Sequence, residues 1–256
     1  MIEIAIALAV IAFALVAIIG VLPTGINVQK DNREDTIVNQ DGPYWMEAIR
    51  NGSKGLDHLT NFVERIGVVL RPLNTNDVTF TTNYAQYNDL RDANPRSDTG
   101  SNIVGLLTIP KGSIYAYDGT PRYVVRVEAQ TRALTGSAVE QGKASTNFAF
   151  SYLLQSEAAP FTGVYVEPDL TNFAALNCQT DPQWKVRATE WSRVKSREMN
   201  TTELRLTFRW PLLANGRVGS NFQRFRVIAT GAKTSVGELR FIEPQTYTVV
   251  PLPPCP

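Results

Sequence analysis

Few side chains in this sequence could support catalysis, and they are scattered. His58 is the only histidine, so neither a multi-histidine metal site nor a histidine-based triad with a spare ligand can be built. Asp57 beside it is typical of a polar surface. Residues 97–101, Ser-Asp-Thr-Gly-Ser, contain the Asp-Thr-Gly of aspartic proteases, but the second copy that a carboxylate dyad requires is missing. The sequence predicts no enzyme, no metal site and no cofactor.

Two cysteines, Cys178 and Cys255, are the other reactive side chains. Neither lies in a CxxC pattern, which argues against a zinc or thioredoxin-type site. They are either buried free thiols or a disulfide that ties the C-terminal tail to the body in an oxidising compartment. We favour the disulfide because the chain begins with an apolar segment. Asn51 and Asn200 each begin an Asn-x-Ser/Thr sequon and are candidate N-glycosylation sites.

The overall charge is nearly balanced, with 25 basic and 24 acidic residues and a formal net charge of +1. Net charge therefore gives no reason to expect a nucleic acid partner. One basic cluster alternates with acids between residues 185 and 198 and is typical of a solvated sheet edge, with adhesion or DNA capture left open. It contains Lys185, Arg187, Arg193, Lys195, Arg197, Glu190 and Glu198.

The longest apolar run lies at the N-terminus, from Ile4 to Leu22. As a helix it covers roughly 28 Å, close to the hydrocarbon thickness of a bilayer. A secretory signal peptide would have a basic start, a shorter apolar run and a small-residue cleavage site, and none of these is present. A plain membrane anchor fits the length but gains nothing from Glu3, because an acid near the apolar phase costs a few kcal/mol unless it is paired or interfacial.

Residues 1–25 resemble the N-terminal segment of type IV pilins and type II secretion pseudopilins. The match begins at Ile2-Glu3-Ile4, continues through an Ala-, Ile- and Val-rich helix and ends at Pro23, where the family often has a helix-kinking proline. In the family the glutamate is the fifth residue of the mature chain. Glu3 occupies the matching position, so this chain begins about two residues inside the family's mature start, without the basic leader that prepilin peptidase cleaves.

The resemblance implies a structural subunit of a type IV pilus-like or type II pseudopilus filament, polymerising through its N-terminal helix. It implies that Glu3 pairs with the N-terminal amine of a neighbouring subunit, which Met1 carries here, and that Pro23 belongs to the same assembly segment. The implied partners are copies of itself or other pilins, the inner membrane before assembly, and the pilus or secretion machinery. The implied location is the inner membrane first, then an extracellular or periplasmic filament.

Two other functions stay open. The first is a monomeric, single-pass, membrane-anchored extracytoplasmic binding domain, in which Glu3 lies passively at the interface. The second is a secreted enzyme behind an atypical signal, which no group of catalytic residues supports.

The remaining pattern predicts an α+β fold, in which a long N-terminal apolar helix is followed by an antiparallel, β-rich globular head. The resemblance implies that this head is pilin-like. We divide the chain into an apolar helix (1–25), an interrupted amphipathic helical segment (26–67) and the head with its tail (68–256). Asp41-Gly42-Pro43 is expected to kink or break the second segment. Strand-like runs are predicted at 103–109, 123–129, 148–154, 184–191, 203–210, 225–229, 239–242 and 247–250.

Overall fold

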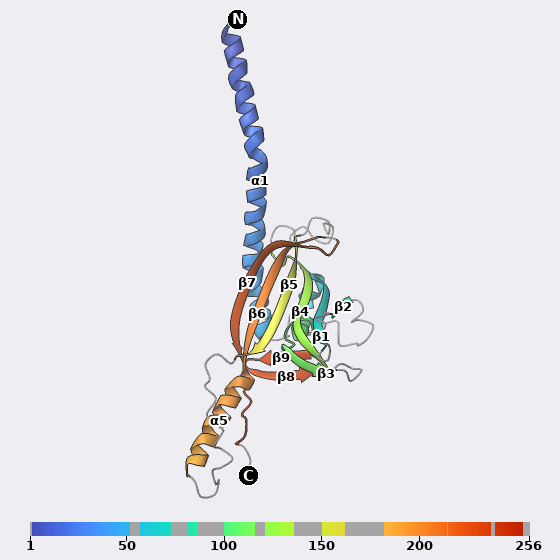
Figure 1. Cartoon of the computed structure of the whole chain (residues 1–256), viewed down its shortest axis with the longest axis vertical. Helices are drawn as coiled ribbons and strands as arrows, with labels where there is room; N and C mark the ends of the chain where they lie inside the picture. The colour runs from blue at the N-terminus through green and yellow to red at the C-terminus, as the bar shows by residue number, and fades with distance from the viewer. Residues whose placement is uncertain are drawn as a thin grey trace.

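The structure is a computed structural model that describes residues 2–51, 57–72, 81–86, 100–115, 121–135, 150–161, 182–213, 215–236 and 239–252. It has the predicted α+β layout, in which a long N-terminal helix is followed by an antiparallel sheet (Figure 1). The predictions for Cys178 and Cys255, and for most of the 97–101 motif, fall outside the described residues.

Helix α1 is a single helix of 50 residues, Ile2–Asn51. It has two halves with different surroundings. Every described residue up to Arg33 is exposed, whereas from Glu34 onward one face of the helix is buried against the head. The buried positions recur at helical spacing, as expected for an amphipathic helix on a sheet. They are Glu34, Ile37, Val38, Asp41, Gly42, Trp45, Met46, Ala48 and Ile49.

The head is built on a seven-stranded antiparallel sheet with the order β2-β1-β4-β5-β6-β7, and β3 pairs with β4 away from this path. A separate hairpin is formed by β8 and β9. The strands are β1 (Val63–Pro72), β2 (Thr81–Gln86), β3 (Gly112–Tyr115), β4 (Pro121–Arg132), β5 (Ser151–Pro160), β6 (Thr201–Leu212), β7 (Val218–Thr230), β8 (Ala232–Val236) and β9 (Leu239–Glu243).

The two faces of this sheet differ in character. Strand β6 shows why, because its side chains alternate between a buried apolar set and an outward polar set. The buried set packs against the second half of α1 and forms the core. Its largest fully buried side chains include Trp45, Tyr152, Phe208, Ile49, Leu154, Leu204 and Leu206. We call the opposite side of the sheet, which points away from α1, the outer face.

The described residues contain three further helical elements. A short 3-10 helix, η1 (Asp57–Asn61), follows α1, and α3 (Gly100–Leu107) packs into the core through Ile103, Val104 and Leu107. Helix α5 (Pro182–Asn200) leads directly into β6 and projects from the end of the sheet opposite to the free half of α1 (Figure 1).

The expected break at Asp41-Gly42-Pro43 is wrong, because α1 continues through both Pro23 and Pro43. Tertiary contacts explain the difference. The carboxylate of Asp41 accepts hydrogen bonds from the head, and Gly42 lies so close to the sheet that any Cβ there would overlap the ring of Phe225. The tripeptide that resembles a helix breaker is the point where the helix meets the sheet.

Several element predictions are confirmed and others are wrong. The runs at 123–129, 203–210, 225–229 and 239–242 are strands, and 148–154 overlaps β5. The run at 103–109 is mostly helix α3, because a short apolar run has no period that separates strand from helix. Residues 63–66, expected to be helical, belong to β1, and 247–250 form no strand. Residues 184–191, with the neighbouring basic cluster, lie on helix α5 rather than on a sheet edge.

We predict that Gly42→Ala destabilises the head, although alanine favours helix. The new methyl group would collide with Phe225, whose ring packs edge-on against Phe208 with the centroids 5.3 Å apart. Overpacking of this kind costs about 1–3 kcal/mol of unfolding free energy. Urea denaturation of the full chain in mild detergent, followed by tryptophan fluorescence, measures this loss. Gly25→Ala is the matched control, because no atom lies within 4 Å of a Cβ there. A variant Gly42→Ala as stable as this control would contradict the prediction.

Candidate functional site

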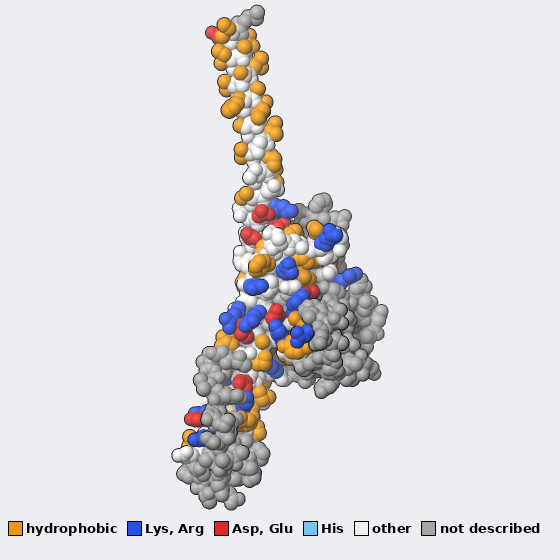
Figure 2. Space-filling model, viewed as in Figure 1, with side chains coloured by type: hydrophobic (Ala, Val, Ile, Leu, Met, Phe, Trp, Pro, Cys, Tyr) orange, Lys and Arg blue, Asp and Glu red, His pale blue; other side chains and the backbone are white. Residues whose placement is uncertain are grey.

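The first half of α1 is the most unusual surface of the molecule. Its large apolar side chains are all exposed, from Ile2 at 77% to Phe13 at 79% and Val28 at 53%. Figure 2 shows them around the shaft of the helix, well separated from the head. Fully burying one such side chain yields about 1.5–3 kcal/mol, so this segment cannot stay in water without a large penalty.

The apolar surface surrounds the helix rather than forming a stripe. No charged side chain lies between Glu3 and Lys30, and a helix that is apolar all round is buried in a membrane or in a large protein core. Among the described residues, α1 is the one helix long and apolar enough to cross a membrane, and its most apolar window is entirely unburied within the chain. The partner that covers it is therefore a bilayer or other chains.

The residues assigned to assembly lie in this exposed half. Glu3 is in the first turn of α1, where the positive end of the helix dipole favours an acid. Pro23 lies inside the helix, directly after the apolar run, and does not interrupt it. Met1 lies outside the described residues. The most apolar window of this half is entirely unburied within the chain, so its packing depends on a second molecule.

The second half of α1 is fixed to the head by a buried hydrogen-bond network that the sequence did not reveal. Asp41, with 0% of its surface exposed, accepts bonds from the Tyr152 hydroxyl and the Leu134 backbone N–H, both at 2.9 Å. Its other oxygen accepts a bond of 2.7 Å from the Thr135 hydroxyl. Trp45 Nε1 in turn donates to the Tyr152 oxygen at 2.9 Å. Helix α1 is thereby joined to β5 and to residues 134 and 135, which follow β4.

Burial is the main cause of the pKa shifts of Asp41 and Tyr152 in this network. It raises the pKa of the Asp41 carboxyl above its ordinary value, although the hydrogen bonds that Asp41 accepts act in the opposite direction. Burial and the neighbouring Asp41 charge raise the pKa of Tyr152 well above its ordinary value. The hydroxyl therefore stays protonated and donates to the carboxylate. The helical spacing of Val38, Asp41, Trp45 and Ile49 is the signal that could have placed Asp41 on the buried face.

The other candidate residues are dispersed. His58 is exposed on η1 and its Nε2 bonds to the Tyr44 hydroxyl. Asn51 is exposed at the end of α1. Asn200 is 2% exposed, and its amide nitrogen donates to the backbone oxygens of Ser196 and Thr248 at 2.5 and 2.6 Å. The acceptor nitrogen of the Asn200 sequon is therefore enclosed in the folded head, whereas Asn51 is accessible. Glycosylation at Asn51 and Asn200 stays a prediction.

Comparison with known proteins finds no family model, no curated protein and no solved structure that matches this chain. The described residues also contain no group of three or more His, Cys, Asp or Glu side chains placed to hold a metal ion. The features on which a function can be argued are therefore the exposed half of α1, its attachment to the head and the surface of the sheet.

We predict that Asp41 gives the head a pH dependence of opposite sign to that of ordinary surface acids. Because its pKa is raised in the folded state, the folded protein binds a proton that the unfolded chain has released, so this group's stabilising contribution is present below the unfolded pKa and is lost as pH rises through the folded one. In Asp41→Asn this fall should be smaller, and the part that remains comes from Glu34, whose pKa burial also raises. Thermal unfolding of the full chain at a series of pH values tests it, with the exposed Asp31→Asn as control. Parallel pH profiles for all three proteins would refute it.

Proposed function

We propose that this chain is a structural subunit of a type IV pilus-like or type II pseudopilus filament, stored in a membrane and assembled through α1. The observation that carries the proposal is the division of one continuous helix into two halves. One half is exposed and apolar on every side, and the other is locked into a folded head. We propose a structural rather than catalytic role for the whole chain.

A helix with this division suits both states of such a subunit. In a bilayer, the run from Ile4 to Leu22 matches the hydrocarbon thickness. In a filament, the same run would be buried against neighbouring copies, where Ala5, Ala9 and Ala12, spaced along one side, permit close approach. Because the helix is continuous with its buried half, movement of the apolar half carries the head with it.

Glu3 is the residue that favours a filament subunit over a simple membrane anchor. At the end of an anchor, a carboxylate in the interface contributes nothing to folding or binding. Within a bundle of packed helices, an unpaired carboxylate would be costly, so it requires a cationic partner. The N-terminal amine of a neighbouring subunit supplies one, and its pairing with Glu3 would set the axial stagger between subunits.

The disulfide stays a prediction, and the described neighbours of the two cysteines support it. The tail binds α5 in antiparallel order: Thr248 bonds to Asn200, and Val250 N donates to Ser196 Oγ at 2.9 Å. The described tail thus runs toward the start of α5, which follows Cys178 by four residues. In the chain-entropy model a bridge across this long loop stabilises by on the order of 4 kcal/mol.

We predict one disulfide between Cys178 and Cys255 in protein from an oxidising compartment. Peptide mapping by mass spectrometry without reduction should find the two cysteine peptides joined, and reduction should separate them. Two titratable thiols in the denatured, unreduced protein would exclude the bridge.

We predict that Glu3→Ala abolishes filaments while leaving the head folded and the chain in the membrane. Electron microscopy of sheared surface material measures assembly, and membrane fractionation measures insertion. Asp31→Ala is the matched control, because it removes an exposed acid from the same helix outside the apolar run. Normal filaments from Glu3→Ala would count against the proposed pairing. A wild-type chain that stays monomeric in the membrane would favour the anchored binding domain instead.

A further inference from the structure

The outer face of the sheet carries an excess of basic side chains that the net charge of the chain conceals. Figure 2 shows Lys and Arg side chains spread across the sheet in this view. On strands β6 and β7 the outward positions include four exposed arginines, Arg205, Arg209, Arg224 and Arg226. Strand β7 ends the order of the sheet, so these arginines lie at its margin.

The register brings these side chains into consecutive rows. Arg205 lies opposite Arg226, Thr207 opposite Arg224, and Arg209 opposite Phe222. Neighbouring rows on one face of a strand lie roughly 7 Å apart, since each row advances two residues. The result is a track of positive charge parallel to the strands, with an aromatic ring at one end.

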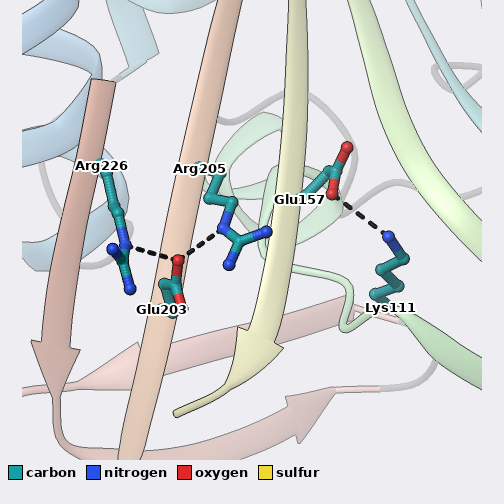
Figure 3. A network of polar contacts seen from close by, with 5 residues as sticks. All are labelled: Lys111, Glu157, Glu203, Arg205 and Arg226. Atoms are coloured by element: carbon teal, nitrogen blue, oxygen red, sulfur yellow. Dashed lines mark hydrogen bonds and ion pairs between the residues drawn. The ribbon is translucent and has the colours of Figure 1, made fainter. Parts of the chain in front are cut away.

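Acidic side chains neutralise only part of this track. Figure 3 shows Glu203 between Arg205 and Arg226, with Arg226 Nε 2.6 Å from its carboxylate oxygen. The hydrogen bond from Arg205 is the main cause that holds the pKa of Glu203 below its ordinary value, so the carboxylate stays charged and positions both guanidinium groups. Glu157 pairs with Lys111 at 3.3 Å.

Arg209 and Arg224 have no acidic partner among the described residues. The Arg224 guanidinium lies over the ring of Phe222, with Cζ 5.3 Å from the centroid. This ring is 59% exposed, which is unusual for phenylalanine on a strand whose opposite side supplies the core. An exposed ring beside two guanidinium groups that lack an acidic partner in the described part of the chain is a surface that can bind both negative charge and a flat ring.

We propose that the outer face of β6 and β7 binds single-stranded nucleic acid. Arginine matches the geometry of phosphate oxygens better than lysine does, and a row of arginines along a strand can follow a phosphodiester backbone. Exposed aromatic rings on sheets stack with bases, and this contact needs no particular sequence. A polyanion without bases would use the arginines but gain nothing from Phe222, which is why the ring decides in favour of nucleic acid. This binding goes beyond the proposed filament and does not require assembly.

Fluorescence anisotropy of the full chain in neutral detergent, with a labelled twelve-residue oligothymidylate, tests the site. Glu203 cancels one of the four arginine charges. With the remaining three engaged, log Kd should change with log salt concentration with a slope of roughly 2 in magnitude. Arg209→Gln/Arg224→Gln should reduce this slope by about 1.4 and weaken binding roughly 25-fold at 0.1 M salt. Phe222→Ala should weaken binding roughly tenfold and leave the slope unchanged.

Matched controls make each result decisive. Lys185→Gln/Arg193→Gln removes the same charge from exposed positions on α5 and should leave the affinity unchanged. Inorganic polyphosphate of equal charge should bind more weakly than oligothymidylate and be insensitive to Phe222→Ala. An equal loss in the α5 control, equal affinity for polyphosphate, or no effect of Phe222→Ala would overturn the proposal, as would tighter binding of duplex DNA. Unchanged melting of each variant confirms that the loss is not one of folding.

Discussion

The whole arrangement depends on how Asp41 is held in the interface between helix and sheet. Apolar contacts attract α1 to the sheet but are non-directional, so they would tolerate a helix displaced along its axis. A buried carboxylate does not, because it is costly unless hydrogen-bond donors meet it. Tyr152 and the backbone at Leu134 supply them at one position only. The network therefore fixes both the height and the rotation of the helix.

This fixed attachment couples the orientation of the exposed half of α1 to that of the head. A flexible tether would leave the head free to turn, whereas one helix that continues from the buried half into the apolar half sets the orientation of the head by that of the helix. If apolar halves bundle together, the face of the sheet that holds α1 must point toward the bundle. The outer face with its arginines then points outward, where ligands can reach it in many copies.

The parts of the fold that sequence predicted are those where apolar side chains alone do the packing. Strand β6 alternates strictly between core and solvent, so its two faces could be assigned before the structure. Helix α5 was missed because its packing face is polar: Ser192, Ser196 and Asn200, four residues apart, bind the backbone of the tail. Hydrophobic periodicity cannot detect such a face. The Asp41 network was missed for a related reason, since its partner Tyr152 lies 111 residues away.

On the outer face, the positions of the arginines follow from which neighbouring side chains are buried in the core. In a strand, each outward side chain is fixed by the inward one beside it, so burial of Leu206 and Phe208 obliges Arg205 and Arg209 to face out. The alternating pattern of β6 is sufficient to predict that Arg205 and Arg209 face outward. It could not show that β7 would align Arg226 with Arg205, because the pairing of two strands is a tertiary property. A one-residue slip of β7 would turn its arginines toward α1, so the apolar packing that specifies the fold also assembles the charged surface.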